Sequence, residues 1–101
     1  MQESKNRVAL IGIIVEDPAS VEQINHLLHD CQDMIFGRMG VPHREKGLSV
    51  ISIAIDGDQD RISALSGRLG AIDGVSTRTV FARSMSAKRG KSTQTDGSTA
   101  R

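Results

Sequence analysis

The sequence has almost no aromatic residues. Only Phe36 and Phe81 are aromatic among its 101 residues, and it has neither tryptophan nor tyrosine. A hydrophobic core must therefore be built from aliphatic side chains and methionine. A chain of this length forms one domain with a modest core, and it is too small for most enzymes that enclose their substrate.

Cysteine and long apolar runs are also scarce. Cys31 is the single cysteine, so the chain cannot form an internal disulfide, and this usage is typical of a reducing cytoplasm. No apolar run has the length of a membrane span, and the N-terminal MQESKNR is not followed by a signal-type apolar block with a cleavage site. We therefore expect a cytoplasmic protein with no membrane partner.

The net charge of +1 hides an uneven distribution of charge along the chain. Residues 83–101 carry five basic residues against Asp96 alone, and they are rich in serine, threonine and glycine. Because this segment also lacks apolar periodicity, we predict an N-terminal extension over 1–6, a folded domain over 7–82 and a basic disordered tail over 83–101. The tail either contacts nucleic-acid phosphates or only solubilises the protein.

Two segments have a strong strand pattern. Arg7 to Val15 is apolar on both faces of a period-two strand, which favours a central position in a sheet. Leu48 to Asp56 alternates between larger and smaller side chains. Ile51, Ile53 and Ile55 point to one face of the strand, and Val50, Ser52 and Ala54 point to the other. The face with the smaller side chains suits the close approach of another backbone or subunit.

Two weaker strands are predicted over 34–41 and 75–82. The first is interrupted by Gly37 and Gly40 and carries Arg38, and the second carries Arg78. Glycine and charge are tolerated best at the edge of a sheet, so both strands are expected there.

Two helices are predicted between the strands. The first begins at Ser20, which stands at capping-box spacing from Gln23, and it ends near Gln32; its buried stripe is Val21, Ile24, Leu27, Leu28 and Cys31. The second begins near Asp58 and Asp60, which suit the positive end of a helix, and its buried stripe is Ile62, Leu65, Leu69 and Ile72. Gly67 inside this helix costs about 1 kcal/mol relative to alanine, so we expect a packing reason for it, such as contact with a strand or a subunit.

The predicted order is strand, helix, strand, strand, helix, strand. With right-handed crossovers this order gives the ferredoxin-like βαββαβ sandwich, an α+β fold with a four-stranded antiparallel sheet and two helices on one face. In that topology the first and third strands are central, as their apolar patterns favour. The uncovered face would expose an apolar patch, so we predict a homodimer or homotetramer that associates through the open sheet face.

The polar loop between the second and third predicted strands is the strongest candidate for a ligand site. Four basic side chains lie in or near it, beside several glycines: Arg38, His43, Arg44 and Lys46. Convergent cations beside exposed backbone could hold a carboxylate or a phosphate, so we predict that these residues bind a small anionic ligand. The alternative is a solvated hairpin in which Glu45 partly neutralises its neighbours.

His26, His29 and Cys31 raise the question of a metal site on the first helix. The two histidines are neighbours on the helix surface, but Cys31 belongs to the apolar stripe and favours a core role. Exposed helical histidines are the preferred interpretation, and we predict no metal and no cofactor. The sequence has no Ser–His–Asp arrangement, phosphate-binding glycine loop or paired catalytic carboxylate, so we predict no enzymatic activity.

Three blocks of the sequence resemble one family of small proteins, the iron-only hydrogenase system regulators. The blocks are RVALIGIIVED, IFGRMGVPHREKGLSVISI and ISALSGRLGAIDGV, and the likeness covers roughly residues 6 to 82 without the tail. The resemblance implies a ferredoxin-like domain similar to ACT modules and to the C-terminal domain of nickel-responsive repressors, which assembles into oligomers.

The resemblance to ACT modules can be examined at one turn. Those modules bind amino acids near the turn after the first strand, where an Asp-x-Pro-Gly-like sequence lets the ligand approach backbone amides. Here the turn reads Glu16-Asp17-Pro18-Ala19, with Ala19 in place of the glycine. Alanine does not easily take a positive φ, so amino-acid binding in the usual ACT manner is disfavoured, although a helix N-terminus could still attract an anion.

We therefore expect a cytoplasmic oligomeric regulatory module that senses a small ligand or contacts a protein partner, in which a ligand biases subunit packing. Direct transcription regulation through DNA is one alternative; only the tail offers positive charge for it, since residues 1–82 are net acidic. A transition-metal sensor using His26, His29 or His43 is the other.

Overall fold

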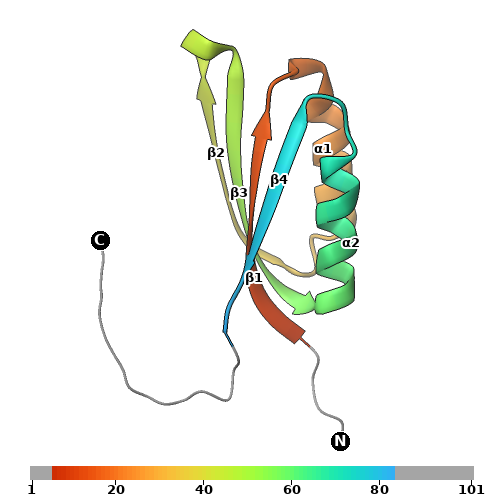
Figure 1. The fold of residues 1–101 in the computed structure, drawn as a ribbon. Coiled ribbons are helices and arrows are strands. Elements are labelled where there is room, and N and C mark those ends of the chain that lie inside the picture. Colours follow the sequence, from red (N-terminus) through yellow and green to blue (C-terminus); the bar gives the residue numbers. More distant parts are fainter. Residues whose placement is uncertain (1–5, 84–101) are drawn as a thin grey trace, which may run out of the picture.

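The alternating apolar pattern folds into two layers, a sheet and a pair of helices (Figure 1). The computed structural model describes residues 6–83. Its strands are β1 (Asn6–Val15), β2 (Ile35–His43), β3 (Leu48–Asp58) and β4 (Val75–Phe81), and its helices are α1 (Val21–Asp30) and α2 (Gln59–Gly70). Both helices lie on one face of the sheet, so the predicted ferredoxin-like fold class is confirmed. The predicted extension over 1–6 and the predicted tail lie outside the described residues, except for Asn6 and Arg83.

The strand order in the sheet is β2-β3-β1-β4, and all neighbouring strands are antiparallel. The first and third strands are therefore central and the other two are at the edges, as predicted. The pairing of β2 with β3 is irregular between Ile35 and Gly37, at the position of Phe36. A bulge of this kind is common in edge strands, and it changes which later side chains share a face.

The core lies between the sheet and the helices. Alternate residues of the two central strands point to it, and they meet the apolar stripes of both helices. Paired residues such as Ile11 and Ile53 are fully buried. The stripe residue Cys31 is half-buried and packs against the core, whereas the largest fully buried side chains are Ile11, Ile13, Ile24, Ile53, Ile55, Ile62 and Leu69. No helix within residues 6–83 is long and apolar enough to cross a bilayer.

The start of α1 differs from the predicted capping box. Ser20 makes no capping hydrogen bond; its Oγ donates a 2.6 Å hydrogen bond to the backbone carbonyl of Asp73 instead. A short 3-10 turn, Pro18–Ser20, precedes α1, and the carboxylate of Asp17 caps this turn by accepting from the backbone N–H of Ala19 at 3.0 Å. The predicted role of Ser20 is wrong because the α2–β4 turn lies beside it and offers a carbonyl.

Two features of α2 were predicted, and one of them is corrected. Asp58 caps the helix by accepting from the backbone N–H of Asp60 at 2.7 Å, in agreement with the expected role of these acids. A methyl group added at Gly67 would meet no atom within 4 Å. A contact with a strand is therefore wrong as the reason for this glycine, whose position faces open space, and a contact with another subunit stays a prediction.

Candidate functional site

The structure separates Arg38 from the other three predicted ligand residues. Arg38 lies within β2, and its Nη2 donates a 2.6 Å hydrogen bond to Oδ1 of Asn25 on α1. The side chain thus points toward the helix layer, where it lines an open groove of about 430 Å³ with His29 and Gln32. Five residues of extended strand place Arg38 roughly 16 Å from His43. A small ligand bound at the hairpin does not reach both residues of one chain.

The structure brings His43, Arg44 and Lys46 together at the tip of the β2–β3 hairpin. His43 ends β2, and the other two belong to a 3-10 turn, Arg44–Lys46. Gly47 closes the turn with a φ of 66°, a left-handed conformation that favours glycine. All three basic side chains are exposed, and Figure 1 shows the tip at the upper left, apart from the helices.

A cavity of about 300 Å³ lies beside this tip, between the hairpin and the turn after β1. His43 and Arg44 line it together with Gly47 and Ser49, and the rest of the lining is apolar: Val15, Pro18, Val21, Pro42 and Leu48. A cation next to an apolar wall suits a ligand that combines an anionic group with a short apolar body. Lys46 is not part of this lining.

The turn after β1 already contains a negatively charged side chain, that of Asp17. The carboxylate of Asp17 already accepts the backbone N–H of Ala19, the residue that stands in place of the ACT glycine. A ligand carboxylate at these amides would have to displace Asp17 and would be repelled by its charge. The geometry therefore agrees with the expectation that amino-acid binding in the ACT manner is disfavoured here.

His26, His29 and Cys31, which were considered for a metal site, do not lie together with further metal-binding side chains in the part of the chain that the structure describes. Nε2 of His26 lies 4.0 Å from Oδ2 of Asp30, one turn along α1, and both side chains are exposed. Within residues 6–83, no group of three or more His, Cys, Asp or Glu side chains could hold a metal ion.

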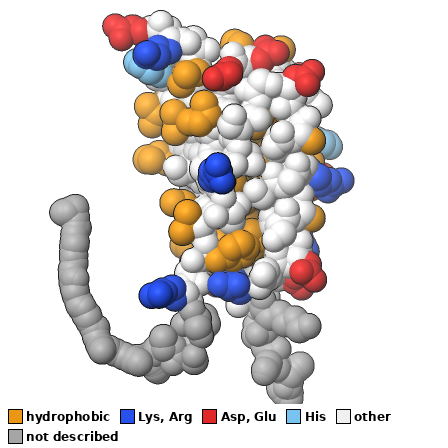
Figure 2. Space-filling view, viewed as in Figure 1, with side chains coloured by type: hydrophobic (Ala, Val, Ile, Leu, Met, Phe, Trp, Pro, Cys, Tyr) orange, Lys and Arg blue, Asp and Glu red, His pale blue; other side chains and the backbone are white. Residues whose placement is uncertain are grey.

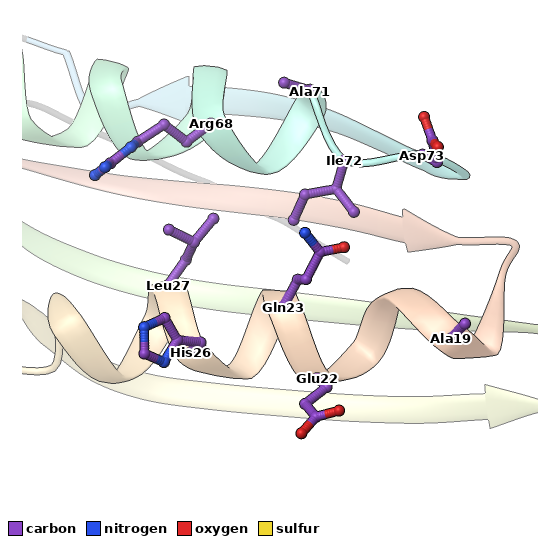
Figure 3. Close-up of a pocket in the computed structure, with 9 residues that line it drawn as sticks. All are labelled: Ala19, Glu22, Gln23, His26, Leu27, Arg68, Ala71, Ile72 and Asp73. Carbon is purple, nitrogen blue, oxygen red and sulfur yellow. The ribbon is translucent and has the colours of Figure 1, made fainter.

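An open groove of about 760 Å³ between α1 and α2 was not predicted from the sequence. Figure 3 shows Gln23, Leu27 and Ile72 pointing into the space between the helices, while Glu22 points away from it. The charged residues around the groove do not converge on one point. The groove arises from the spacing of two packed helices, which the separate apolar stripes of the sequence do not reveal.

One exposed ion pair, Arg61–Asp33, connects α2 to the segment before β2. Nη1 and Nη2 of Arg61 donate hydrogen bonds to the two carboxylate oxygens of Asp33 at 2.9 and 3.2 Å. The hydrogen bonds from Arg61 lower the pKa of Asp33 and raise the pKa of Arg61. Because both side chains are exposed to water, this pair contributes little to stability, and it forms no site.

The uncovered side of the sheet, here called the open face, carries the most unusual surface of the molecule. It consists of the outward residues of all four strands, and seven of these are exposed large hydrophobic side chains: Val8, Leu10, Ile14, Met39, Val41, Val50 and Val80. Figure 2 shows hydrophobic side chains gathered along the strand side of the molecule. Patches of this kind on a small domain mark association with another surface.

A ferredoxin-like domain with helices on one sheet face and an apolar open face is the class of protein that this geometry defines. Residues 7–79 match the model of the TM1266-like family, described as "Iron-only hydrogenase system regulator, putative". The chain belongs to this family, which confirms the resemblance drawn from the sequence.

One solved structure agrees with this assignment. The chain is similar to the uncharacterized protein TM1266 from Thermotoga maritima, with 37% sequence identity and a TM-score of 0.74. The match covers 77% of this chain and 99% of that chain. A comparison with curated proteins found no match.

Proposed function

We propose that this protein is a non-enzymatic regulatory module of an iron-only hydrogenase system, and that it works as an oligomer that senses a small anionic ligand. The family description supports the regulatory role. The exposed apolar open face is the observation that carries the oligomer, because covering it with a second apolar surface removes it from water. A homodimer is the simplest closed assembly through one such face, and a homotetramer needs a second interface.

The ligand site in this proposal is the cavity beside the hairpin tip. His43 and Arg44 would hold the anionic group, and the apolar wall would hold a short hydrocarbon body, so a small carboxylate is the ligand class that fits. Lys46 adds positive charge nearby without lining the cavity. A ligand that bound one arrangement of subunits better than another would shift the assembly toward that arrangement.

The oligomer is tested with a charge at the centre of the open face. Leu10→Asp should leave only monomer at micromolar concentration by light scattering, because an unpaired carboxylate is costly to bury. The matched control is Ala64→Asp, which places the same charge on the exposed surface of α2 and should leave the wild-type mass unchanged. A strictly monomeric wild-type protein would overturn the oligomer.

The ligand site is tested by a thermal-shift series with small carboxylates of increasing hydrocarbon length. The wild-type melting temperature should rise with at least one of them, and Arg44→Ala and His43→Ala should each remove the rise. Arg38→Ala is the matched control, because Arg38 lies in a different groove and should leave the rise intact. Loss of the shift in Arg38→Ala alone would move the site to α1 and β2.

A further inference from the structure

Two opposite charges lie on the otherwise apolar open face. Asp56 on β3 pairs in register with Val8 of β1, and Arg78 on β4 pairs with Gly12 of β1. Both side chains are exposed, and paired residues of a sheet share a face. Neither residue forms an ion pair within residues 6–83, where the salt bridges are His26–Asp30 and Arg61–Asp33.

Asp56 and Arg78 cannot pair within one chain. They lie on strands that flank β1, so about 10 Å separates them across the sheet, and four residues of register add about 13 Å along it. Their backbones are therefore roughly 16 Å apart. The midpoint of this line falls on β1 halfway between Val8 and Gly12, which is Leu10.

We propose that two copies of this chain pack open face to open face about a two-fold axis above Leu10, with Arg78 of each copy paired to Asp56 of the other. This inference rests on the proposed homodimer and specifies its geometry. A two-fold axis that lies between the two sheets, parallel to them and perpendicular to the line from Asp56 to Arg78, places Arg78 of each copy opposite Asp56 of the other, so it forms the pair twice. Packed sheets lie about 10 Å apart, a gap that arginine and aspartate side chains from opposite faces can span together.

The surroundings of Leu10 fit a close approach at the axis. Ala54 pairs with Leu10 across the sheet, and Gly12 and Ser52 form the next pair on the same face. These small residues leave room for Leu10 of the second copy. The exposed hydrophobic side chains of the open face surround Leu10. The proposed interface therefore has an apolar centre with charged residues beside it.

The charges of Arg78 and Asp56 favour a second copy of this chain as the partner that covers the open face. An apolar partner would leave both Arg78 and Asp56 buried without a counter-ion, which is costly, whereas a second copy supplies both counter-ions in place. The chain's own residues 84–101 do not fit an apolar face, because Met85, Ala87 and Ala100 are their only hydrophobic residues.

The test uses charge reversal in the full chain, followed by sedimentation equilibrium. Asp56→Arg alone and Arg78→Asp alone each replace two ion pairs by two like-charge contacts, so each should raise the dimer dissociation constant at least about tenfold. An equimolar mixture of the two variants should restore the dimer, because each mixed dimer again contains two Arg–Asp pairs. The double variant Asp56→Arg/Arg78→Asp should also dimerise. Circular dichroism checks that every variant is folded.

The possible outcomes separate this inference from the proposed function. A monomeric wild-type protein contradicts the homodimer itself. If the wild type dimerises and Leu10→Asp dissociates it while both single charge variants remain dimeric, the open face is the interface and the ion pair is wrong. If both single variants are folded monomers and their mixture stays monomeric, the pairing is wrong as well. Only dissociation of each variant followed by rescue in the mixture supports it.

Discussion

The two faces of the sheet use the same kind of residue for different purposes. Ile11 and Leu10 are neighbours on β1 and similar in hydrophobicity, yet Ile11 is fully buried under the helices and Leu10 is 47% exposed on the open face. The covered face supplies the packing that makes the domain fold. The open face retains apolar surface that the isolated chain does not use. β1 therefore contains more hydrophobicity than its own fold requires, and the excess is the basis of the proposed interface between copies.

Alanine substitutions on the two faces should separate folding from association. Ile11→Ala removes fully buried methyl groups and should lower the free energy of unfolding by about 2–5 kcal/mol. Leu10→Ala should cost the monomer only about 1 kcal/mol, because half of the side chain is already exposed. Denaturant unfolding at protein concentrations low enough to dissociate any dimer measures both values. Equal costs would show that the open face is part of the folding core.

Each face of the sheet also contains a glycine whose surroundings differ from those of the other. Gly57 is buried on the covered face, and an added methyl group would collide with the side chain of Met34, so Gly57→Ala should cost about 1–3 kcal/mol. Gly12 lies on the open face, where the nearest atom to an added methyl is the Arg78 carbonyl oxygen at 3.9 Å. Gly12→Ala should therefore change monomer stability by less than about 0.5 kcal/mol while weakening the dimer. Thermal unfolding and molar mass together check this pair.

A polar contact tests whether the covered side depends only on apolar packing. Ser20 is buried, and removing its hydroxyl leaves the Asp73 carbonyl without this partner. Ser20→Ala should lower the free energy of unfolding by about 1 kcal/mol. Ser63→Ala is the matched control, because Ser63 is exposed on α2 and makes no side-chain hydrogen bond within residues 6–83. A similar cost for both serines would contradict the assigned role of Ser20.

The outer surface of α2 belongs to neither face and should give the smallest effect. Gly67→Ala should raise the free energy of unfolding by up to about 1 kcal/mol, because alanine is the better helix former and its methyl group meets open space. Gly70→Ala on the same helix should gain less, since its methyl group would lie 3.0 Å from Oγ1 of Thr77. Destabilisation by Gly67→Ala would reveal a contact on this surface that the isolated chain lacks.

The fold could be predicted from the sequence because the hydrophobic pattern of each strand matched its position. β1 is apolar on both sides and is central, and the strands that carry Arg38 and Arg78 are at the edges. The predicted order of helices and strands then indicated the ferredoxin-like topology. The capping role of Ser20 was predicted wrongly because its hydroxyl donates to the carbonyl of Asp73, and a local motif cannot anticipate a contact between two distant turns.

The candidate site was harder to predict than the fold. The irregular pairing near Phe36 determines that Arg38 faces the helices, where it binds Asn25, while Met39 and Val41 face the open side. A bulge adds one residue and exchanges the faces of those that follow, and the sequence of an edge strand with two glycines does not reveal where it falls. Proximity in sequence therefore grouped Arg38 with His43, Arg44 and Lys46, although its side chain lies elsewhere.

The molar mass of the wild-type full chain, measured by sedimentation equilibrium over a range of micromolar concentrations, shows whether copies of the chain associate. The chain has a mass of 10.9 kDa. If the open face is an interface between copies, the mass should rise with concentration to at least twice that value. A constant mass of 10.9 kDa throughout this range would show that the open face is not an interface between copies.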